Sequence, residues 1–456
     1  MQNPDLTNES FHMKKVGQNF LGILNDLKRR PEDASNELDV PLEKIIDIIH
    51  GKELLSTEII TKAIKIWPVN VSDFHIIFDD TINGIKIMTA EESKLTSRTM
   101  NRSGKPYYEY RDTVMSTVAP FRPEWIMELC YVDNNDPENL DAKWNNGHFM
   151  HQFTYFIGDV NFYYLDQNNK KQIAIMKTGD SMYISPFVPH TFTSRNKSNN
   201  GLILALTYGN KLSGDAKQEL SSLSTKYGSQ FSLDFSTRES ASGSLLKFHR
   251  EISSLTLDEI STRTKIPKNI VHDLESSKRL PTSEELTILA NSFNINSREL
   301  LPPDLIDDKV IVNYYDKARR WTYPDNLIIY EFVELASTRT LPFSKTFEIN
   351  IKNPNNIESE LKVGLHQFIY NVGDTIIDLN WEFDNKKYTQ KIQPGDSLYI
   401  KPFLKHNFLG IGKLVVLRVG GKIPGDSQRE LSTLGKRNTQ RAIDESTQWF
   451  DPKGKN

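Results

Sequence analysis

The sequence predicts an α+β protein in which a helix-turn-helix-like helical unit followed by a jelly-roll β-barrel occurs twice. The first observation is an internal repeat: HQFTYFIGDV at 151–160 returns as HQFIYNVGDT at 366–375, and GDSMYISPFVPHTF at 179–192 returns as GDSLYIKPFLKHNF at 395–408. The second is that both blocks are rich in aromatic and β-branched residues between Gly-Asp and Pro turns, which is typical of short antiparallel strands. The third is that apolar residues three and four positions apart precede each block, which indicates helices.

Four consecutive segments follow from this repeat. The helical patterns cover about residues 14–68 and 244–300, and each contains an apolar-Pro step, Val40-Pro41 and Ile266-Pro267, at which the proline opens the next helix. The Ser-, Lys- and Gly-rich stretch 209–243 is expected to link the two halves. The predicted domains are 1–70 (first helical unit), 71–235 (first barrel), 236–303 (second helical unit) and 304–456 (second barrel).

Composition narrows the class of protein. The 456 residues include 56 basic and 59 acidic side chains, and this balance excludes a strongly basic protein that coats nucleic acid. The single cysteine, Cys130, excludes a disulfide scaffold, a cysteine-based zinc site and an iron–sulfur cluster. No apolar run approaches the roughly 18 residues of a membrane span, and the polar N-terminus does not resemble a secretory signal. We therefore expect no membrane partner and a location in the reducing cytoplasm.

The strongest chemical signal is a set of candidate metal ligands in the first barrel. On a strand, His148 and Gln152 would have the same parity and share a face, and His190 on a later strand could complete the set. Two imidazoles and one oxygen ligand on one side of a divalent ion form the facial triad of non-haem Fe(II) oxygenases. An amide in place of the usual carboxylate leaves the site about one positive charge higher, so an anionic substrate is expected.

The second barrel provides an internal comparison. The position that matches the first histidine of the set is Val363, whereas Gln367 and His406 remain. Two ligands without the third make a poor metal site, so this barrel is predicted to be structural, with a degenerate metal set. His151 has the opposite strand parity and persists as His366 in the degenerate copy. We therefore expect His151 to pack in the fold or to lie behind the ligands.

These motifs resemble those of a known family. The pattern N-x-G-H-x-x-x-(E/Q) at 145–152, followed by the V-P-H step that ends at His190, resembles the cupin-type mononuclear iron oxygenases that process phosphonates. Hydroxypropylphosphonate epoxidase and hydroxyethylphosphonate dioxygenase belong to that family, and the resemblance covers nearly the whole chain. It implies Fe(II) as cofactor, held by His148, Gln152 and His190, with a small phosphonate and O2 as substrates.

The third ligand distinguishes the reactions within the family. The epoxidase has Glu where this chain has Gln152, and the dioxygenase takes its carboxylate six residues before the last histidine, where this chain has Ile184. With neither carboxylate, the resemblance implies cleavage of the C–C bond of 2-hydroxyethylphosphonate by O2, giving methylphosphonate and CO2. Ile184 would then lie in the pocket beside the ligands.

The resemblance also implies residues that bind the substrate. Arg102 matches the family arginine that bonds phosphonate oxygens, a charge-assisted and bidentate type of contact. Tyr110 would donate a further hydrogen bond, and Tyr107 and Tyr108 are secondary candidates. Asn145, three residues before the first ligand, matches the family asparagine beside the substrate.

A lysine on the helical unit also reaches the phosphonate in this family. Lys28 is the best match, although the alignment could slip to Arg29 or Arg30, and a solvated basic helix face is the alternative. The sequence leaves open whether Lys28 acts in its own chain or in a neighbouring copy of a homo-oligomer.

The sequence leaves other function classes open. A DNA-binding regulator with a ligand-sensing cupin has the same layout, but the presumptive recognition helix LEKIIDIIHGK carries Glu43 and Asp47, which suits packing better than phosphate contact. Nucleic acid is thus disfavoured as a partner. The remaining alternatives are a dioxygenase that yields hydroxymethylphosphonate and formate, a cupin isomerase, and a structural double cupin. Mn, Co or Zn could replace iron in such a ligand set.

Overall fold

A computed structural model describes residues 4–119, 121–209, 215–303, 309–324, 328–352 and 360–444. The described residues form helices and four antiparallel sheets, so the predicted α+β class is confirmed. One compact unit comprises Met1–Asn210 and Val310–Asn456, and the other comprises Lys211–Lys309. Among the described residues, no helix combines the length and the apolar character needed to cross a lipid bilayer.

The first helical segment folds around its own apolar core. Pro41 is the cap residue of the third helix, as the sequence predicts, and Leu38, Ile45 and Ile48 on either side of it are buried. The side chain of Ser56 caps the fourth helix by accepting a hydrogen bond from the backbone of Ile59. The elements are α1 (Pro4–Asp26), α2 (Pro31–Leu38), α3 (Leu42–Ile49), α4 (Thr57–Ile66), η1 (Val71–Phe74) and, after the first strand, α5 (Ala90–Leu95).

The second compact unit is entirely helical in its described part. Pro267 caps the helix that follows it, and Ile260, Val271 and Leu289 lie in the core of the unit. The stretch predicted as a linker, 209–243, contains three short helical elements and the start of a longer helix, while its residues 210–214 lie outside the described part. The elements are α6 (Asp215–Ser222), α7 (Thr225–Gly228), η2 (Ser229–Phe231), α8 (Arg238–Ile252), α9 (Leu257–Thr264), α10 (Lys268–Glu275), α11 (Ser283–Phe293) and η3 (Ser297–Leu300).

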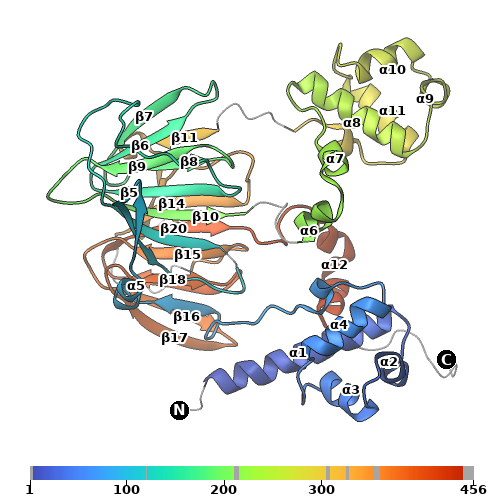
Figure 1. Cartoon of the computed structure of the whole chain (residues 1–456), viewed down its shortest axis with the longest axis horizontal. Coiled ribbons are helices and arrows are strands. Elements are labelled where there is room, and N and C mark those ends of the chain that lie inside the picture. The colour runs from blue at the N-terminus through green and yellow to red at the C-terminus, as the bar shows by residue number, and fades with distance from the viewer. Residues whose placement is uncertain are drawn as a thin grey trace. The chain divides into compact units, whose positions relative to one another are not determined.

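The described strands form two large sheets of seven strands and two small sheets of three strands, which Figure 1 shows as one stack. The first large sheet has the order β11 (Val310–Asn313), β8 (Ser181–Ile184), β5 (His151–Ile157), β10 (Leu202–Tyr208), β4 (Arg122–Glu128), β3 (Lys105–Asp112) and β2 (Arg98–Arg102). Its small sheet has the order β7 (Lys171–Met176), β6 (Val160–Leu165) and β9 (His190–Ser194).

The second pair of sheets has a matching order. The large sheet runs β1 (Ile85–Met88), β18 (Ser397–Ile400), β15 (His366–Asn371), β20 (Gly412–Val419), β14 (Ser344–Ile351), β13 (Tyr330–Glu334) and β12 (Arg320–Tyr323). The small sheet runs β17 (Lys386–Ile392), β16 (Ile377–Phe383) and β19 (Lys405–Leu409). The remaining elements are η4 (Tyr315–Lys317) and α12 (Asp426–Asp444).

Three apolar cores separate these sheets. One contains residues of both large sheets, such as Phe153 and Tyr155 of β5 with Phe368 and Tyr370 of β15, so the two large sheets pack face to face. The others lie between each large sheet and the small sheet of the same half. Because side chains alternate along a strand, odd residues of β5 face the joint core and even residues face the interior of the first half. We call these two interiors the first and second barrel.

The two halves exchange edge strands. The N-terminal strand β1 pairs with β18 of the second half, with Ile85 opposite Ile400. Reciprocally, β11 pairs with β8 of the first half, with Val310 opposite Ile184. The domain boundaries at residues 70, 235 and 303 remain predictions from the repeat. Because β1 pairs with the second half and β11 pairs with the first half, hydrogen-bonded sheets join segments that lie on different sides of these boundaries. A repeat in sequence carries no signal for which copy an edge strand joins.

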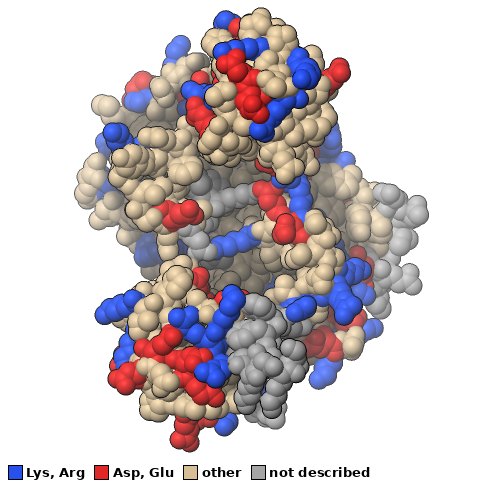
Figure 2. All heavy atoms as spheres, turned by 90° about the vertical axis from the view of Figure 1, so that its right-hand side faces the viewer, with Lys and Arg blue, Asp and Glu red and all other residues tan. Residues whose placement is uncertain are grey.

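Charged groups of both signs are interspersed on the face shown in Figure 2. On the presumptive recognition helix, Lys44 pairs with Glu53, and Asp47 pairs with Lys52. These ion pairs engage Lys44 and Lys52 with acidic neighbours, which leaves both lysines less available for contacts with phosphate.

Candidate active site

The structure brings the three predicted ligands together at one end of the first barrel. The Nε2 atom of His148 lies 3.0 Å from Oε1 of Gln152, and the rings of His148 and His190 have centroids 5.3 Å apart and are nearly perpendicular. Gln152 is the second residue of β5 and His190 is the first residue of β9. Two strands from opposite sheets thus deliver a nitrogen and an oxygen donor to one point.

His148 reaches this point in a different way from the one predicted. It lies before β5 rather than on it, so strand parity does not orient its side chain. Its backbone carbonyl instead accepts a hydrogen bond from Phe187 at 2.8 Å. The neighbouring Gly147 has a positive φ of 74°, and a Cβ there would fall 2.5 Å from the backbone of Phe187. The glycine therefore allows the close approach that holds His148 against the β8–β9 turn.

The hydrogen bonds of these side chains leave one donor atom of each facing the centre. Nδ1 of His148 donates to the carbonyl of Met150 and Nδ1 of His190 donates to the carbonyl of Val188, both at 2.8 Å, in the tautomer that leaves each Nε2 a lone pair. The amide nitrogen of Gln152 donates to Oγ1 of Thr154 at 2.9 Å, which turns its Oε1 toward His148. Metal-bound imidazoles and amides are oriented by such outer contacts, so the three residues fit a divalent ion.

Burial keeps the second histidine neutral. Burial lowers the pKa of His190 to about 4, so its imidazole is unprotonated at neutral pH; its Nε2 lone pair faces Nδ2 of Asn145 at 3.1 Å, and a bound ion would replace that contact. In the described part of the chain, no three His, Cys, Asp or Glu side chains cluster as ligands. The candidate set thus consists of neutral donors only, and a bound cation would keep its full charge.

Asn145 lies directly beside this set. Its Nδ2 is 3.1 Å from Nε2 of His190, while its Oδ1 accepts hydrogen bonds from the backbone of His190 at 3.0 Å and of Gly147 at 2.9 Å. The asparagine therefore ties the loop before β5 to the start of β9.

Arg102 lies at the β9 side of the first barrel. Its Nη1 donates to Oγ1 of Thr191 at 3.1 Å and to the carbonyl of Lys143. Its guanidinium lies 5.0 Å and 4.7 Å from the ring centroids of Tyr107 and Tyr108. Because Thr191 follows His190 on β9, the arginine is tethered one residue from a candidate ligand.

The three tyrosines differ in the state of their hydroxyl groups. Those of Tyr107 and Tyr108 are 3.0 Å and 2.9 Å from Oγ1 of Thr191, so both are already engaged. Tyr110 makes no hydrogen bond through its hydroxyl to any residue that the structure describes, and burial raises its pKa to about 12. Burial raises the pKa of all three hydroxyl groups, so they differ in engagement and not in protonation: among the described residues only the hydroxyl of Tyr110 has no partner, and it can donate to an anion. Thr191, which organises the other two, carried no signal in the sequence.

The remaining predicted residues lie in the core of the first barrel, in the joint core between the large sheets, and after the first helix. Ile184 is opposite Gln152 in the register of β5 and β8 and belongs to the core of the first barrel. His151 faces the joint core between the two large sheets, with Nδ1 2.6 Å from the hydroxyl of Tyr183. His366 makes the same contact with Tyr399 at 2.7 Å. Lys28 follows α1 with a positive φ of 58°.

Sequence reasoning missed a buried acid in this barrel. Glu128, opposite Tyr108 in the β3–β4 register, is fully buried, and neither of its carboxyl oxygens has a hydrogen-bond partner among the described residues. Burial raises its pKa well above the usual range, and the charge of Arg102 opposes that rise. In the second barrel the residue opposite the corresponding Tyr330 is Ile351. Of the two barrels, only the first therefore has an unpartnered acid at this position.

This acid predicts a pH-dependent stability. The unfolded chain loses the Glu128 proton above about pH 4.3, whereas the folded chain keeps it up to a much higher pH. The free energy of unfolding therefore falls by about 1.4 kcal/mol per pH unit from the unfolded pKa up to the folded pKa. We expect Glu128→Gln to match the parent at pH 4 and to melt at a higher temperature at pH 7. Thermal melts at both pH values test this. The control is Glu91→Gln, because the side chain of Glu91 is 82% exposed. Equal shifts of the melting temperature by Glu128→Gln at both pH values would contradict the prediction.

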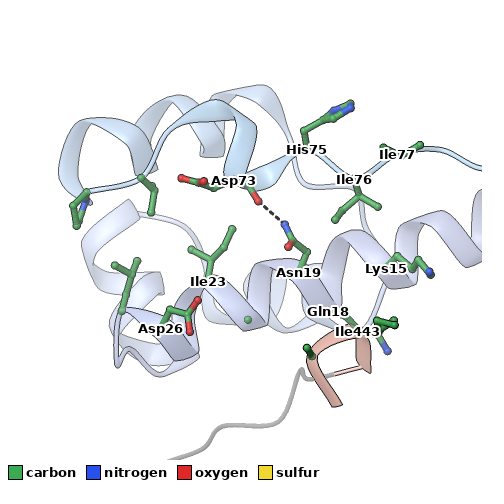
Figure 3. Close-up of a pocket in the computed structure, with 15 residues that line it drawn as sticks. Lys15, Gln18, Asn19, Ile23, Asp26, Asp73, His75, Ile76, Ile77 and Ile443 are labelled. Atoms are coloured by element: carbon green, nitrogen blue, oxygen red, sulfur yellow. Dashed lines mark hydrogen bonds between the residues drawn. The ribbon is translucent and has the colours of Figure 1, made fainter. Parts of the chain in front are cut away.

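A separate cavity of about 890 Å³ lies in the first helical segment (Figure 3). It is lined by α1, by residues 68–77 and by the end of α12, and Nδ2 of Asn19 donates across it to the carbonyl of Asp73 at 2.7 Å. None of the predicted ligands or substrate contacts lines it. The cavity is therefore distinct from the cluster in the first barrel.

Comparison with known proteins identifies the family. No family model matches the chain. Methylphosphonate synthase of Nitrosopumilus maritimus (strain SCM1) is 59% identical over 446 residues, which cover 98% of this chain and 97% of that protein. (S)-2-hydroxypropylphosphonic acid epoxidase of Streptomyces wedmorensis is 28% identical over 131 residues, 28% of this chain and 62% of the epoxidase. Among solved structures, HEPD of Streptomyces albus with 2-hydroxyethylphosphonate and Fe(II) bound has a TM-score of 0.89 at 31% identity, covering 98% of this chain and 100% of that one. The chain belongs to the methylphosphonate synthase family.

Proposed function

We propose that the protein is a mononuclear Fe(II)-dependent oxygenase that converts 2-hydroxyethylphosphonate and O2 into methylphosphonate, CO2 and water. The observation that carries the proposal is the convergence of His148, Gln152 and His190, each with its outer contact made and its donor atom facing one point. The 59% identity to methylphosphonate synthase supports the reaction, and the Fe(II) bound in HEPD supports the metal.

The residues of the chain would divide the work as follows. His148, Gln152 and His190 would hold the ion, which supplies the activation of O2 when bound. Arg102 and Tyr110 would bind the phosphonate oxygens, and a neutral ligand set favours that dianion because no carboxylate offsets the charge of the metal.

Positioning would decide the product, since a carbon radical in a loose pocket has several partners. Ile184 fills the place beside Gln152 with an apolar side chain and excludes water there. Asn145, tethered at both ends of its amide, would keep the hydroxyl end of the substrate in one orientation. These roles act on orientation and solvent exclusion rather than on proton transfer.

We also propose that the chain arose by duplication of one unit of helices and cupin barrel. The matching strand orders of the two large sheets support this, as does the pair of equivalent contacts His151–Tyr183 and His366–Tyr399.

The direct test is reconstitution of the protein with Fe(II) without oxygen, addition of 2-hydroxyethylphosphonate and air, and phosphorus NMR. We expect a methylphosphonate signal together with CO2 release. Hydroxymethylphosphonate with formate would overturn the product assignment and keep the fold and the metal. No consumption of substrate by fully iron-loaded protein would overturn the proposal as a whole.

The amide ligand gives a sharper prediction. We expect Gln152→Glu to lower the rate and to change the ratio of phosphonate products, because a carboxylate cancels about one positive charge at the metal. The matched control is Gln367→Glu, the same change in the second barrel, which should leave the product ratio untouched. Phosphorus NMR of the product mixture is the measurement. Methylphosphonate as sole product from an iron-loaded, active Gln152→Glu protein would contradict a role for the amide.

A further inference from the structure

The second barrel retains most of the architecture of the candidate metal site. The carbonyl of Val363 accepts a hydrogen bond from Phe403 at 2.7 Å, as the carbonyl of His148 accepts one from Phe187. Nδ1 of His406 donates to the carbonyl of Leu404 at 2.9 Å, so its Nε2 faces inward like that of the first-barrel ligand. Two of three donors and the loop for the third are thus in place.

One residue in the interior of this barrel differs sharply from its counterpart. Gln152 lies opposite Thr207 in the β5–β10 register, whereas Gln367 lies opposite Arg418 in the equivalent β15–β20 register. Arg418 shares the strand face of Leu414 and Val416, which belong to the core of the second barrel, so its side chain enters the interior. The second barrel therefore has a long cationic side chain where the first barrel has a threonine, at the place where a metal would lie.

Arg418 and Gln367 together engage the two donor side chains that remain in the second barrel. Its Nε donates to Oε1 of Gln367 at 3.1 Å, which is the atom that a metal would need. The other end of that amide, Nε2, lies 3.4 Å from Nε2 of His406. The guanidinium also lies over the rings of Phe332 and Phe347, at 5.8 Å and 5.2 Å from their centroids. No carboxylate pairs with it in the described part of the chain.

We propose that the second barrel contains a latent site for a divalent transition-metal ion, which the Arg418 guanidinium fills and which Val363 leaves one ligand short. The cation of the side chain stands where the cation of the metal would be, and it uses the same amide oxygen. Replacing Arg418 by the threonine of the first barrel and Val363 by histidine recreates two imidazoles and an amide oxygen, a set that binds such ions. The ligand chemistry rests on the proposed function of the first barrel.

The test counts metal per chain. Full-length protein is loaded with Co(II) without oxygen, desalted and analysed by elemental mass spectrometry, with Co(II) electron paramagnetic resonance as a second readout. We expect one equivalent for the parent, for Val363→His and for Arg418→Thr, and two for Val363→His/Arg418→Thr. In a His148→Ala/His190→Ala background the double variant should bind one equivalent where that background alone binds none.

The outcomes separate this inference from the proposed function. One equivalent in the parent and one in a folded double variant would overturn the latent site. No metal in the parent would overturn the proposed function of the first barrel instead. If the threonine variant loses its circular dichroism melt, Val363→His/Arg418→Met keeps the apolar volume in the barrel and removes the charge, and the same count applies to it.

Discussion

Replacing His190 by alanine is expected to abolish turnover and to weaken Fe(II) binding by more than about 100-fold. Loss of a mere outer contact of a metal ligand costs about 10- to 100-fold, and this change removes the ligand itself. Nδ1 of the imidazole donates to the carbonyl of Val188, and Nδ2 of Asn145 lies 3.1 Å from its Nε2, so the ring is fixed on both sides. Metal content after desalting and oxygen consumption with 2-hydroxyethylphosphonate are the measurements.

The chain supplies its own control for this experiment. His406 has the same position in the second barrel, the same bond from Nδ1 to a backbone carbonyl, and the same burial. His406→Ala should keep the metal and the turnover and lose only stability. Equal loss of iron from both variants would show that the effect is one of folding and would contradict the assignment of the metal to the first barrel.

Replacing Arg102 by glutamine is expected to raise KM for 2-hydroxyethylphosphonate by about 10- to 100-fold. Each hydrogen bond to a charged group contributes about 1.5–3 kcal/mol, and about 1.4 kcal/mol corresponds to tenfold. The guanidinium is held by Thr191 and lies over the ring of Tyr108. Because it is already ordered, the side chain loses little conformational entropy when the substrate binds. Steady-state kinetics with iron-loaded protein give KM and kcat separately.

Arg111 on the adjacent strand β3 is the matched control. Its guanidinium pairs with Glu109 instead of facing Thr191, so Arg111→Gln should leave KM unchanged. A parallel increase of KM in both variants would point to damage to the sheet. An unchanged KM in Arg102→Gln with full iron content would remove Arg102 from the phosphonate site.

The proximity of His148, Gln152 and His190 could be predicted from the sequence because these residues lie in two short motifs. Gln152 is on β5, where strand parity gives the correct face, and parity also separates it correctly from His151. The reason given for His148 was wrong, because a loop bonded to Phe187 sets its direction. Parity applies only within a strand, and the end of a strand is not marked in the sequence.

Other features of the site could not be predicted because they depend on contacts between distant segments. Thr191 anchors Arg102 across 89 positions, and nothing in the sequence around the threonine marks it as an anchor. Glu128 reads as the polar end of a strand, yet it is fully buried. The contact between Arg418 and Gln367 could not be predicted either, because it depends on which residues of β20 and β15 lie opposite each other.

The exchange of edge strands has a consequence for biosynthesis. When the ribosome has completed β8 at Ile184, the strand that pairs with its outer edge begins only at Val310, 126 residues later by subtraction of those positions. At about 5–20 residues per second the wait is roughly 6–25 s, during which the nascent first half presents an open sheet edge that could pair with another chain. Its own strand β1 must stay unpaired still longer, until β18 appears. Neither half can therefore complete its large sheet from its own strands alone: the first sheet must wait for β11 and the second must wait for β18.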